Sequence, residues 1–447
     1  MSAEIVDRAV RGVEARRPDL GLAVRAAADS LTAGEGTQMI HQAALQQFLW
    51  WFLPRQYPQD KWDGLADATA ELLDELGLGR LAGIARSGQT AVVLDAWVEG
   101  PKIGAAVFRS AHGDSGVDPP DTPLLAWGSI MGVDEARALD TVERALAGAI
   151  DARQLVPGVP RWRVKASEIT QNVLSARLDL PPGQTLAGLV ATERIGTWND
   201  SARHPLHKEW RSWVANRLLN RIEPPTDPSK SVEPMRWLVE LAADGGAELT
   251  QSNYLARSTV IAAVERFGWW DWPKPPRSEA DVHQLSTLRD AANHLRLVRR
   301  RGRRLHVTSH GKDLLQNPDQ LWQAVSGETE DGEDFTRMVT ELVGLRLLQG
   351  QVERRKLIAE VGPILAAQGW SAGGSPITVN HASSSVGCPL RWWRIFGALD
   401  EEESKWEYGT ARELTPHTIA LTPDGERMVL EYLWSRAAGP RTSVYEL

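Results

Sequence analysis

The residues best suited to chemistry in this 447-residue chain are five arginines in one short run. They are Arg299, Arg300, Arg301, Arg303 and Arg304, interrupted only by Gly302. Guanidinium groups this close repel one another unless water or an anion screens them, and a planar guanidinium matches the paired oxygens of a phosphate. The run therefore predicts a phosphate contact of the kind that nucleic acids offer. The alternative is a basic loop that is solvated or paired with acidic protein surface.

A helix is expected just before this run, because apolar residues recur there at helical spacing from Val282 to Leu295. Its other face would show His283, Gln284, Thr287 and Asp290. Gln and Thr side chains can hydrogen bond to base edges, whereas an Asp opposes phosphate. We therefore count Gln284 and Thr287, with the five arginines, as candidate nucleic-acid-binding residues.

Patterns for catalysis or metal binding are weak. His204 and His207 form an H-P-L-H motif, but it lacks a second ligand pair, and the proline disfavours a regular helical face. Cys388 precedes a proline and an apolar stretch, which we interpret as the start of a helix rather than as a nucleophile. The glycine-rich runs lack the strand and lysine of a phosphate loop. We predict no catalytic residue, no metal and no cofactor.

The bulk composition is that of a soluble globular protein with several domains. Its net charge of −8 argues against a surface that is wholly coated with nucleic acid, although a local basic face is compatible with it. A single cysteine excludes an internal disulfide and favours a reducing compartment, and no stretch reaches the length of a membrane span. We expect a cytoplasmic protein that makes no membrane contact. The 19 tryptophans are interpreted as packing between helices.

The elements that must position the arginines follow from a repeat. Val307-Thr308-x-x-Gly311-x-x-Leu314 matches Leu421-Thr422-x-x-Gly425-x-x-Met428. In both copies a helix and a short strand-like stretch come before the motif and a helix follows it. This order is typical of a winged helix-turn-helix, and the arginines would form the wing of the first copy.

The predicted fold class is mainly α with small β wings (α+β). We expect a mostly helical N-terminal domain over 1–222, with a possible division into two subdomains near 112–130. Four prolines between Glu223 and Pro234 predict a linker over 223–233. Winged-helix modules would follow at 234–325 and 326–437, and a tail at 438–447.

The two modules differ in charge. Residues 234–325 contain 13 Lys and Arg against 10 Asp and Glu, a balance of +3, whereas residues 326–436 contain 11 against 17, a balance of −6. The second wing would carry the acidic stretch from Asp400 to Glu403. We therefore expect only the first, basic wing to meet phosphate, while the second, acidic wing would avoid it.

Residues 234–437 resemble the C-terminal region of bacterial proteins similar to a plasmid open reading frame three. The residues that carry the resemblance are Met235 to Leu238, Leu249-Thr250, Tyr254-Leu255, Leu305 to Leu315, Arg394 to Gly397 and Leu421 to Met428. Residues 45–90 resemble only the opening of hypothetical proteins. The resemblance implies a fold and no activity.

Three functions remain open from the sequence. The first is a non-enzymatic winged-helix protein associated with double-stranded DNA, a regulator or plasmid-type accessory factor that contacts phosphate through the basic wing. The second is a protein–protein interaction scaffold, with a partner or self-association through the N-terminal domain or the second module. The third is an enzyme or toxin with an unrecognised site in the N-terminal half.

Overall fold

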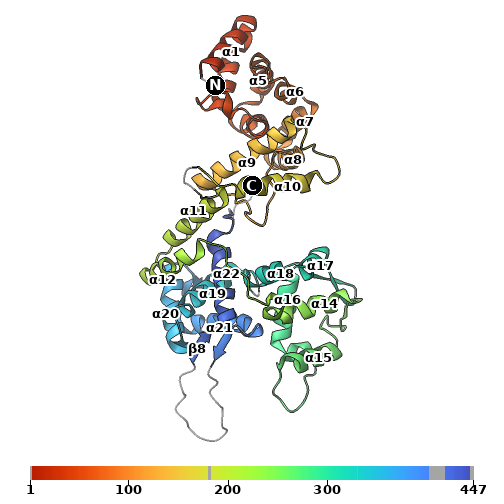
Figure 1. The fold of residues 1–447 in the computed structure, drawn as a ribbon, viewed down its shortest axis with the longest axis vertical. Helices are drawn as coiled ribbons and strands as arrows, with labels where there is room; N and C mark the ends of the chain where they lie inside the picture. Colours follow the sequence, from red (N-terminus) through yellow and green to blue (C-terminus); the bar gives the residue numbers. More distant parts are fainter. Residues whose placement is uncertain (1–2, 180–182, 330, 402–417, 443–447) are drawn as a thin grey trace. The chain divides into compact units, whose positions relative to one another are not determined.

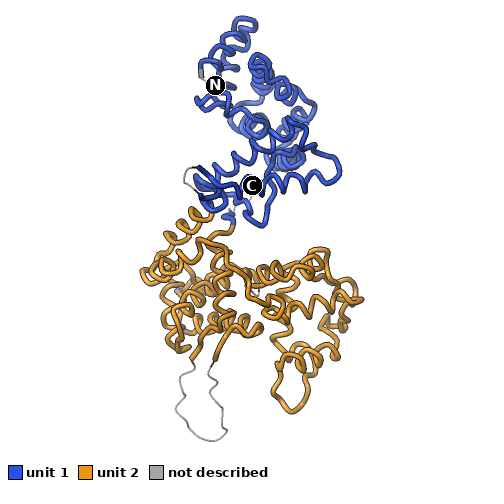
Figure 2. Tube along the Cα trace, in the orientation of Figure 1, with its two compact units in different colours: residues 1–190, 440–447 blue, residues 191–439 orange. Residues whose placement is uncertain are grey.

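The computed structural model describes residues 3–179, 183–329, 331–401 and 418–442. The described chain is mainly helical and carries small antiparallel sheets (Figure 1), which confirms the coarse fold class. It divides into two compact units (Figure 2). Unit 1 comprises residues 1–190 and 440–447, and unit 2 comprises residues 191–439. No helix within the described residues is both long enough and apolar enough to cross a membrane.

Unit 1 is built from helices. Its α-helices are α1 (Ala3–Arg16), α2 (Gly21–Thr32), α3 (Gln42–Gln47), α4 (Leu53–Gln56), α5 (Trp62–Glu75), α6 (Gly79–Ala85), α7 (Gly88–Glu99), α8 (Pro101–Asp114), α9 (Val133–Asp151), α10 (Trp162–Ser175) and the first part of α11 (Leu186–Asp200). One hydrophobic core joins the helices between Val6 and Leu94, and another joins those between Leu125 and Val190. Amphipathic helices pack their apolar stripes into each of these cores.

A π-helix (η3, Phe48–Phe52) joins α3 to α4. Pro54 is the second residue of α4. The helical path runs from α3 through η3 into α4 without a break, so Pro54 removes one backbone donor from it. The path ends two residues later, at Gln56.

Unit 2 contains the same order of elements twice. The first copy comprises α14 (Glu233–Ala243), β1 (Ala247–Glu248), α15 (Arg257–Phe267), α16 (His283–His294), β2 (Val298–Arg301), β3 (Arg304–Val307) and α17 (Ser309–Leu315). The second comprises α19 (Asp334–Leu347), β4 (Val352–Glu353), α20 (Arg354–Ala367), α21 (Val379–Ile395), β7 (Leu399–Glu401), β8 (Thr418–Leu421) and α22 (Pro423–Ala438). The sheets have equivalent strand orders, β1-β3-β2 and β4-β8-β7, and all pairs are antiparallel. The first copy is followed by α18 (Pro318–Ser326), and the second has an inserted hairpin, β5 (Ser371–Ala372) with β6 (Ser375–Pro376).

The repeated sequence motif has one structural role in both copies. The Thr308 hydroxyl accepts a hydrogen bond from the N–H of Gly311 at 2.9 Å, and Thr422 caps α22 through Gly425 at 3.1 Å. A Cβ atom at Gly311 would lie 2.2 Å from the carbonyl oxygen of Leu297, and one at Gly425 would lie 1.9 Å from that of Ala398. Threonine caps the helix, and glycine lets the helix approach the backbone just before β2 or β7, so both residue types are required by packing.

The boundary between the units falls before the proline-rich segment that the sequence suggested as a linker. Ile195, Trp198, Trp210, Val214 and Leu218 belong to the core of unit 2. They lie on α11, α12 (Pro205–Ala215) and a short 3-10 helix, η5 (Asn216–Leu218). Within the proline-rich segment, Pro228–Ser231 forms α13, and Val232 is fully buried. Apolar helices upstream of the prolines therefore extend unit 2 back to residue 191.

The C-terminal segment has a structural partner in unit 1. The backbone N–H of Ile130 donates to the carbonyl oxygen of Arg441 at 3.0 Å. α22 ends at Ala438, so the described residues of the predicted tail leave unit 2 directly after that helix.

Candidate nucleic-acid interface

The five candidate arginines lie on the β2–β3 hairpin of unit 2. Arg301 pairs with Arg304 across the hairpin, which leaves Gly302 and Arg303 as a two-residue turn. Gly302 has a φ of +57°. A positive φ at the first turn residue suits the right-handed twist of a tight hairpin and favours glycine. The interruption in the arginine run is therefore the turn itself.

The register distributes the arginines around the hairpin. Arg299 pairs with His306, and Arg300 pairs with the buried Leu305. Paired residues share a face, and faces alternate along a strand, so Arg299, Arg301 and Arg304 lie together on the face away from Leu305. All five arginines are exposed.

Among the described residues, none of these five arginines has an acidic partner. Arg304 differs from the other four, because one of its guanidinium nitrogens, Nη1, donates to the carbonyl oxygens of Gly245 and Gly246 at 2.9 and 3.2 Å. Like charges placed directly opposite, such as Arg301 and Arg304, destabilise a strand pair unless an anion or solvent screens them. The hairpin thus presents concentrated positive charge that the described protein does not neutralise.

Gln284 and Thr287 lie on α16, and both are half-buried. α16 contacts α21 of the second copy. Burial, and then Arg391 and Arg394 of α21, lower the pKa of His283. His294, farther along α16, lies 3.6 Å from a carboxylate oxygen of Glu328, in the connection to the second copy.

His283, Thr287 and His294 follow one stripe of the helix, because they stand at i, i+4 and i+11. The arginines that act electrostatically on His283 and the carboxylate beside His294 all lie outside the first copy. Thr287 therefore lies on the stripe of α16 that the second copy approaches, and Gln284 lies one residue from it. The structure does not leave this face open in the way that it leaves the arginine hairpin open.

Another cation of α16 already has a partner. Arg289 donates to a carboxylate oxygen of the buried Glu279 at 2.8 Å. The same carboxylate oxygen accepts from the backbone N–H of Leu255 at 2.6 Å. Arg289 therefore holds the first copy together and does not add to the free charge of the hairpin.

The described part of the equivalent hairpin in the second copy offers less positive charge. Glu401 of β7 binds Arg394 through two hydrogen bonds of 2.6 and 2.8 Å, while Asp400 is exposed. Glu402 and Glu403, the rest of the acidic stretch noted in the sequence, lie outside the described residues. In the described part, then, only the first hairpin carries an unpaired basic run.

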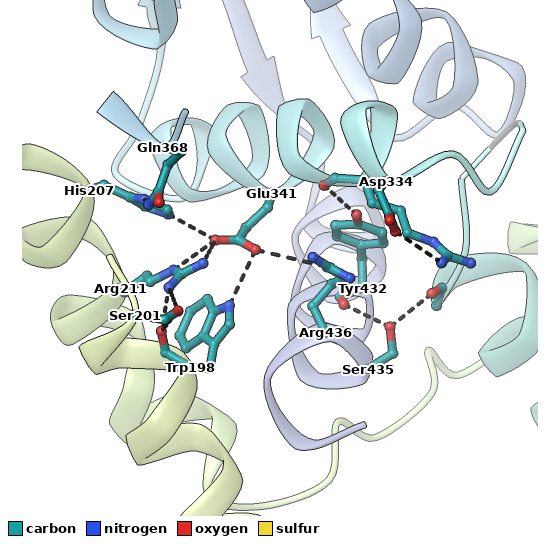
Figure 3. A network of polar contacts seen from close by, with 12 residues as sticks. Trp198, Ser201, His207, Arg211, Asp334, Glu341, Gln368, Tyr432, Ser435 and Arg436 are labelled. Carbon is teal, nitrogen blue, oxygen red and sulfur yellow. Dashed lines mark hydrogen bonds and ion pairs between the residues drawn. The ribbon is translucent and has the colours of Figure 1, made fainter. Parts of the chain in front are cut away.

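Sequence reasoning missed a buried polar network around Glu341 of α19 (Figure 3). Glu341 is fully buried and accepts from Arg211 at 2.7 Å, from His207 at 2.9 Å and from the indole N–H of Trp198 at 3.2 Å. Arg436 of α22 adds a longer ion pair at 3.9 Å. Burial alone would raise the pKa of Glu341, but Arg211, His207 and Arg436 lower it to about 2.

This network explains the H-P-L-H motif. His204 accepts from the backbone N–H of Leu206 and caps α12. Burial lowers the pKa of His207, against the effect of Glu341, and a neutral ring satisfies both of its contacts. Its Nε2–H donates to Glu341, and its Nδ1 accepts from Gln368 at 2.8 Å. Within the described residues, no group of three or more His, Cys, Asp or Glu side chains could hold a metal ion.

Comparison with known protein families gives a match to part of unit 2. The family described as Y4jL N-terminal domain matches residues 229–320, a segment that covers the first copy, from α14 to α17, and continues into α18. No curated protein and no solved structure matches the chain.

Proposed function

We propose that unit 2 contains two winged-helix modules and that the first contacts the phosphate backbone of double-stranded nucleic acid through its arginine hairpin. The assignment of the modules is supported by the order helix–strand–helix–helix–strand–strand, found twice, with equivalent antiparallel sheets. In this assignment α16 and α21 occupy the positions of recognition helices, and the β2–β3 hairpin is the first wing.

One observation carries the functional proposal. The wing carries five exposed arginines, and none of them has an ion-pair partner in the described chain. Phosphate oxygens supply the charge and the planar geometry that guanidinium groups match. A chain with a net charge of −8 would bind nucleic acid only over such a local face.

We infer that the wing binds without reading sequence. Base readout needs a helix face that can enter the major groove. The stripe of α16 that carries Thr287 meets groups of the second module instead. Phosphate contacts fix the position of a protein on a duplex but carry no sequence information. The proposed role is therefore that of a regulator or accessory factor with sequence-independent contacts.

A scaffold role remains the second candidate. The contact between α16 and α21 favours it, because helices that would read DNA pack against each other instead. In that case the arginine wing would meet an acidic protein surface, and nucleic acid would not compete for it.

Duplex binding measured across salt tests the proposal. In the full chain, Arg299→Ser, Arg301→Ser and Arg303→Ser are combined and compared with Arg8→Ser, Arg109→Ser and Arg137→Ser. The control arginines are exposed and, within the described residues, form no ion pair, so both variants lose the same charge.

The slope of log affinity against log salt is negative, and the wing variant should make it less steep by roughly 1 to 3, because each lost phosphate contact contributes about 0.9 to its magnitude. The control variant should keep the wild-type slope. Thr287→Ala should change neither affinity nor slope, and two unrelated duplex sequences should bind equally. Equal slopes for wild type and wing variant would refute the phosphate contact, whereas a loss confined to one duplex would refute sequence independence.

A further inference from the structure

Unit 1 contains a cavity of about 820 Å³ that the arginine hairpin does not involve. It lies between the end of the π-helix, α4 and the turn from α7 to α8. Its lining includes Trp51, Arg55, Trp97, Lys102 and Ile103. This volume falls within the range of small-molecule sites, and such sites are commonly found between the helices of bundles.

The aromatic wall of the cavity is held in place. The indole N–H of Trp97 donates to the carbonyl oxygen of Trp50 at 2.9 Å, inside the π-helix. A Cβ atom at Gly104 would lie 2.3 Å from the Trp97 ring, so the ring rests directly on the backbone of α8. Trp51 meets Trp97 edge to face, with ring centroids 5.6 Å apart. A wall fixed in this way loses little side-chain freedom when a flat ligand packs against it.

Positive charge borders the same wall. The Arg55 guanidinium lies 4.4 Å from the Trp51 ring centroid, in a cation–π arrangement. Arg55 and Lys102 form no ion pair in the described chain, although both line the cavity. Glu99 is the one acidic residue of the lining, so the cations outnumber it.

Apolar surface around the cavity stays open. Ile103 is 45% exposed, and Phe52 and Val98, which neighbour lining residues in the chain, are 42% and 52% exposed. A ligand that covers Ile103 and packs on the indoles would remove apolar area from water. A negatively charged group on that ligand would reach Arg55 or Lys102.

We propose that this cavity binds a small, flat, apolar molecule that carries one negative charge, such as an aromatic carboxylate or sulfonate. The rings of Trp51 and Trp97 would contact its flat surface, and Arg55 and Lys102 would bind its anionic group. This binding site is independent of the proposed nucleic-acid contact.

Two fluorescent probes of similar shape test the proposal on the full chain. 8-Anilinonaphthalene-1-sulfonate carries the negative charge, and N-phenyl-1-naphthylamine lacks it. The double variant Arg55→Gln and Lys102→Gln should weaken binding of the sulfonate about tenfold, and leave affinity for the neutral probe within about twofold. Trp97→Ala should weaken the binding of both probes.

Controls separate ligand contact from unfolding. Trp272→Ala removes a tryptophan that is 75% exposed in unit 2 and should affect neither probe. Ile103→Glu changes a side chain on the open side of the cavity, so the fold should persist while the sulfonate is repelled. Every variant must give the same circular dichroism spectrum as wild type. The proposal is wrong if the double variant Arg55→Gln and Lys102→Gln binds the sulfonate as tightly as wild type does, or if it loses affinity for both probes equally. It is also wrong if Trp97→Ala leaves the affinity for both probes unchanged.

Discussion

Glu143 of unit 1 shows how a single buried carboxyl can make stability depend on pH. Its side chain is almost fully buried on α9, and it accepts from the side-chain amide of Gln47 at 3.2 Å. Burial, together with the charges of Asp140 and Asp118, raises the pKa of Glu143 to about 8. The folded chain therefore holds a proton at Glu143 that the unfolded chain releases near its ordinary pKa of 4.5.

Because the folded state binds the extra proton, protonated Glu143 stabilises the folded chain relative to the unfolded chain. This stabilisation is fully present below pH 4.5 and is lost as the pH rises to about 8. The loss is at most about 1.4 kcal/mol per pH unit. Glu143→Gln keeps a neutral side chain at every pH and should abolish that part of the dependence. The variant should be more stable than wild type at pH 8 and closely similar at pH 4.5, as measured by urea unfolding.

Glu168→Gln serves as the control, because this residue of unit 1 lies at the surface, with 57% of its side chain exposed. It should follow the wild-type curve at both pH values. If Glu143→Gln and wild type lose stability in parallel between pH 5 and 8, Glu143 is not protonated in the folded chain.

At the scale of elements, Glu341 joins four helices. α19 supplies the carboxylate, α12 supplies His207 and Arg211, α22 supplies Arg436, and α11 supplies Trp198 (Figure 3). Glu341→Gln would leave the buried Arg211 without its counterion. Removing one partner of a buried ion pair costs about 3–5 kcal/mol. The unfolding free energy of unit 2 should fall by that amount.

Glu360→Gln is the matched control in the same unit. Glu360 binds Arg346 at 2.8 Å but is partly exposed, so its loss should cost about 1 kcal/mol or less. The pKa of Glu341, lowered to about 2, adds a second test. Its stabilisation is present above pH 4.5 and is lost as the pH falls towards 2, so the gap between wild type and Glu341→Gln should narrow in acid. An equal loss of unfolding free energy in Glu341→Gln and Glu360→Gln would contradict this role of Glu341. So would a difference between wild type and Glu341→Gln that does not change with pH.

The sequence predicted those elements whose cause is local. Thr308 and Thr422 cap the following helices through Gly311 and Gly425, three residues away, so this cause is local, whereas the carbonyl groups that the glycines approach belong to the more distant Leu297 and Ala398. The turn of the arginine hairpin also has a local cause, because Gly302 adopts a positive φ there. Local chemistry of this kind is visible without any knowledge of the tertiary structure.

Sequence reasoning failed where neighbours distant in the chain decide the outcome. Cys388 was expected to start a helix, but α21 runs from Val379 to Ile395 with Pro389 inside it. Helical periodicity shows that α16 has an apolar face, yet it cannot show that the second copy approaches another face. The partners of Glu341 lie 130 and 134 residues away at Arg211 and His207, which no local pattern reveals.

At the scale of the whole molecule, the limits of unit 2 depend on where its core ends rather than on where prolines cluster. Trp210, Val214 and Leu218 are buried in that core, although they precede the proline-rich segment. Each large apolar side chain that is fully buried contributes about 1.5–3 kcal/mol. Helix α12 and the part of α11 from residue 191 onward are therefore structural parts of unit 2.

Two fragments test whether unit 2 begins within α11 or after the proline-rich segment. A fragment of residues 186–442 keeps α11 and α12 intact and should unfold cooperatively in urea. A fragment of residues 223–442 loses the three buried side chains and removes His207 and Arg211 from Glu341. Its unfolding free energy should be lower by more than about 5 kcal/mol, or it should fail to fold, because apolar burial and a buried counterion are lost together. Equal urea midpoints for the two fragments would instead place the boundary at the prolines, and would make α11 and α12 dispensable to unit 2.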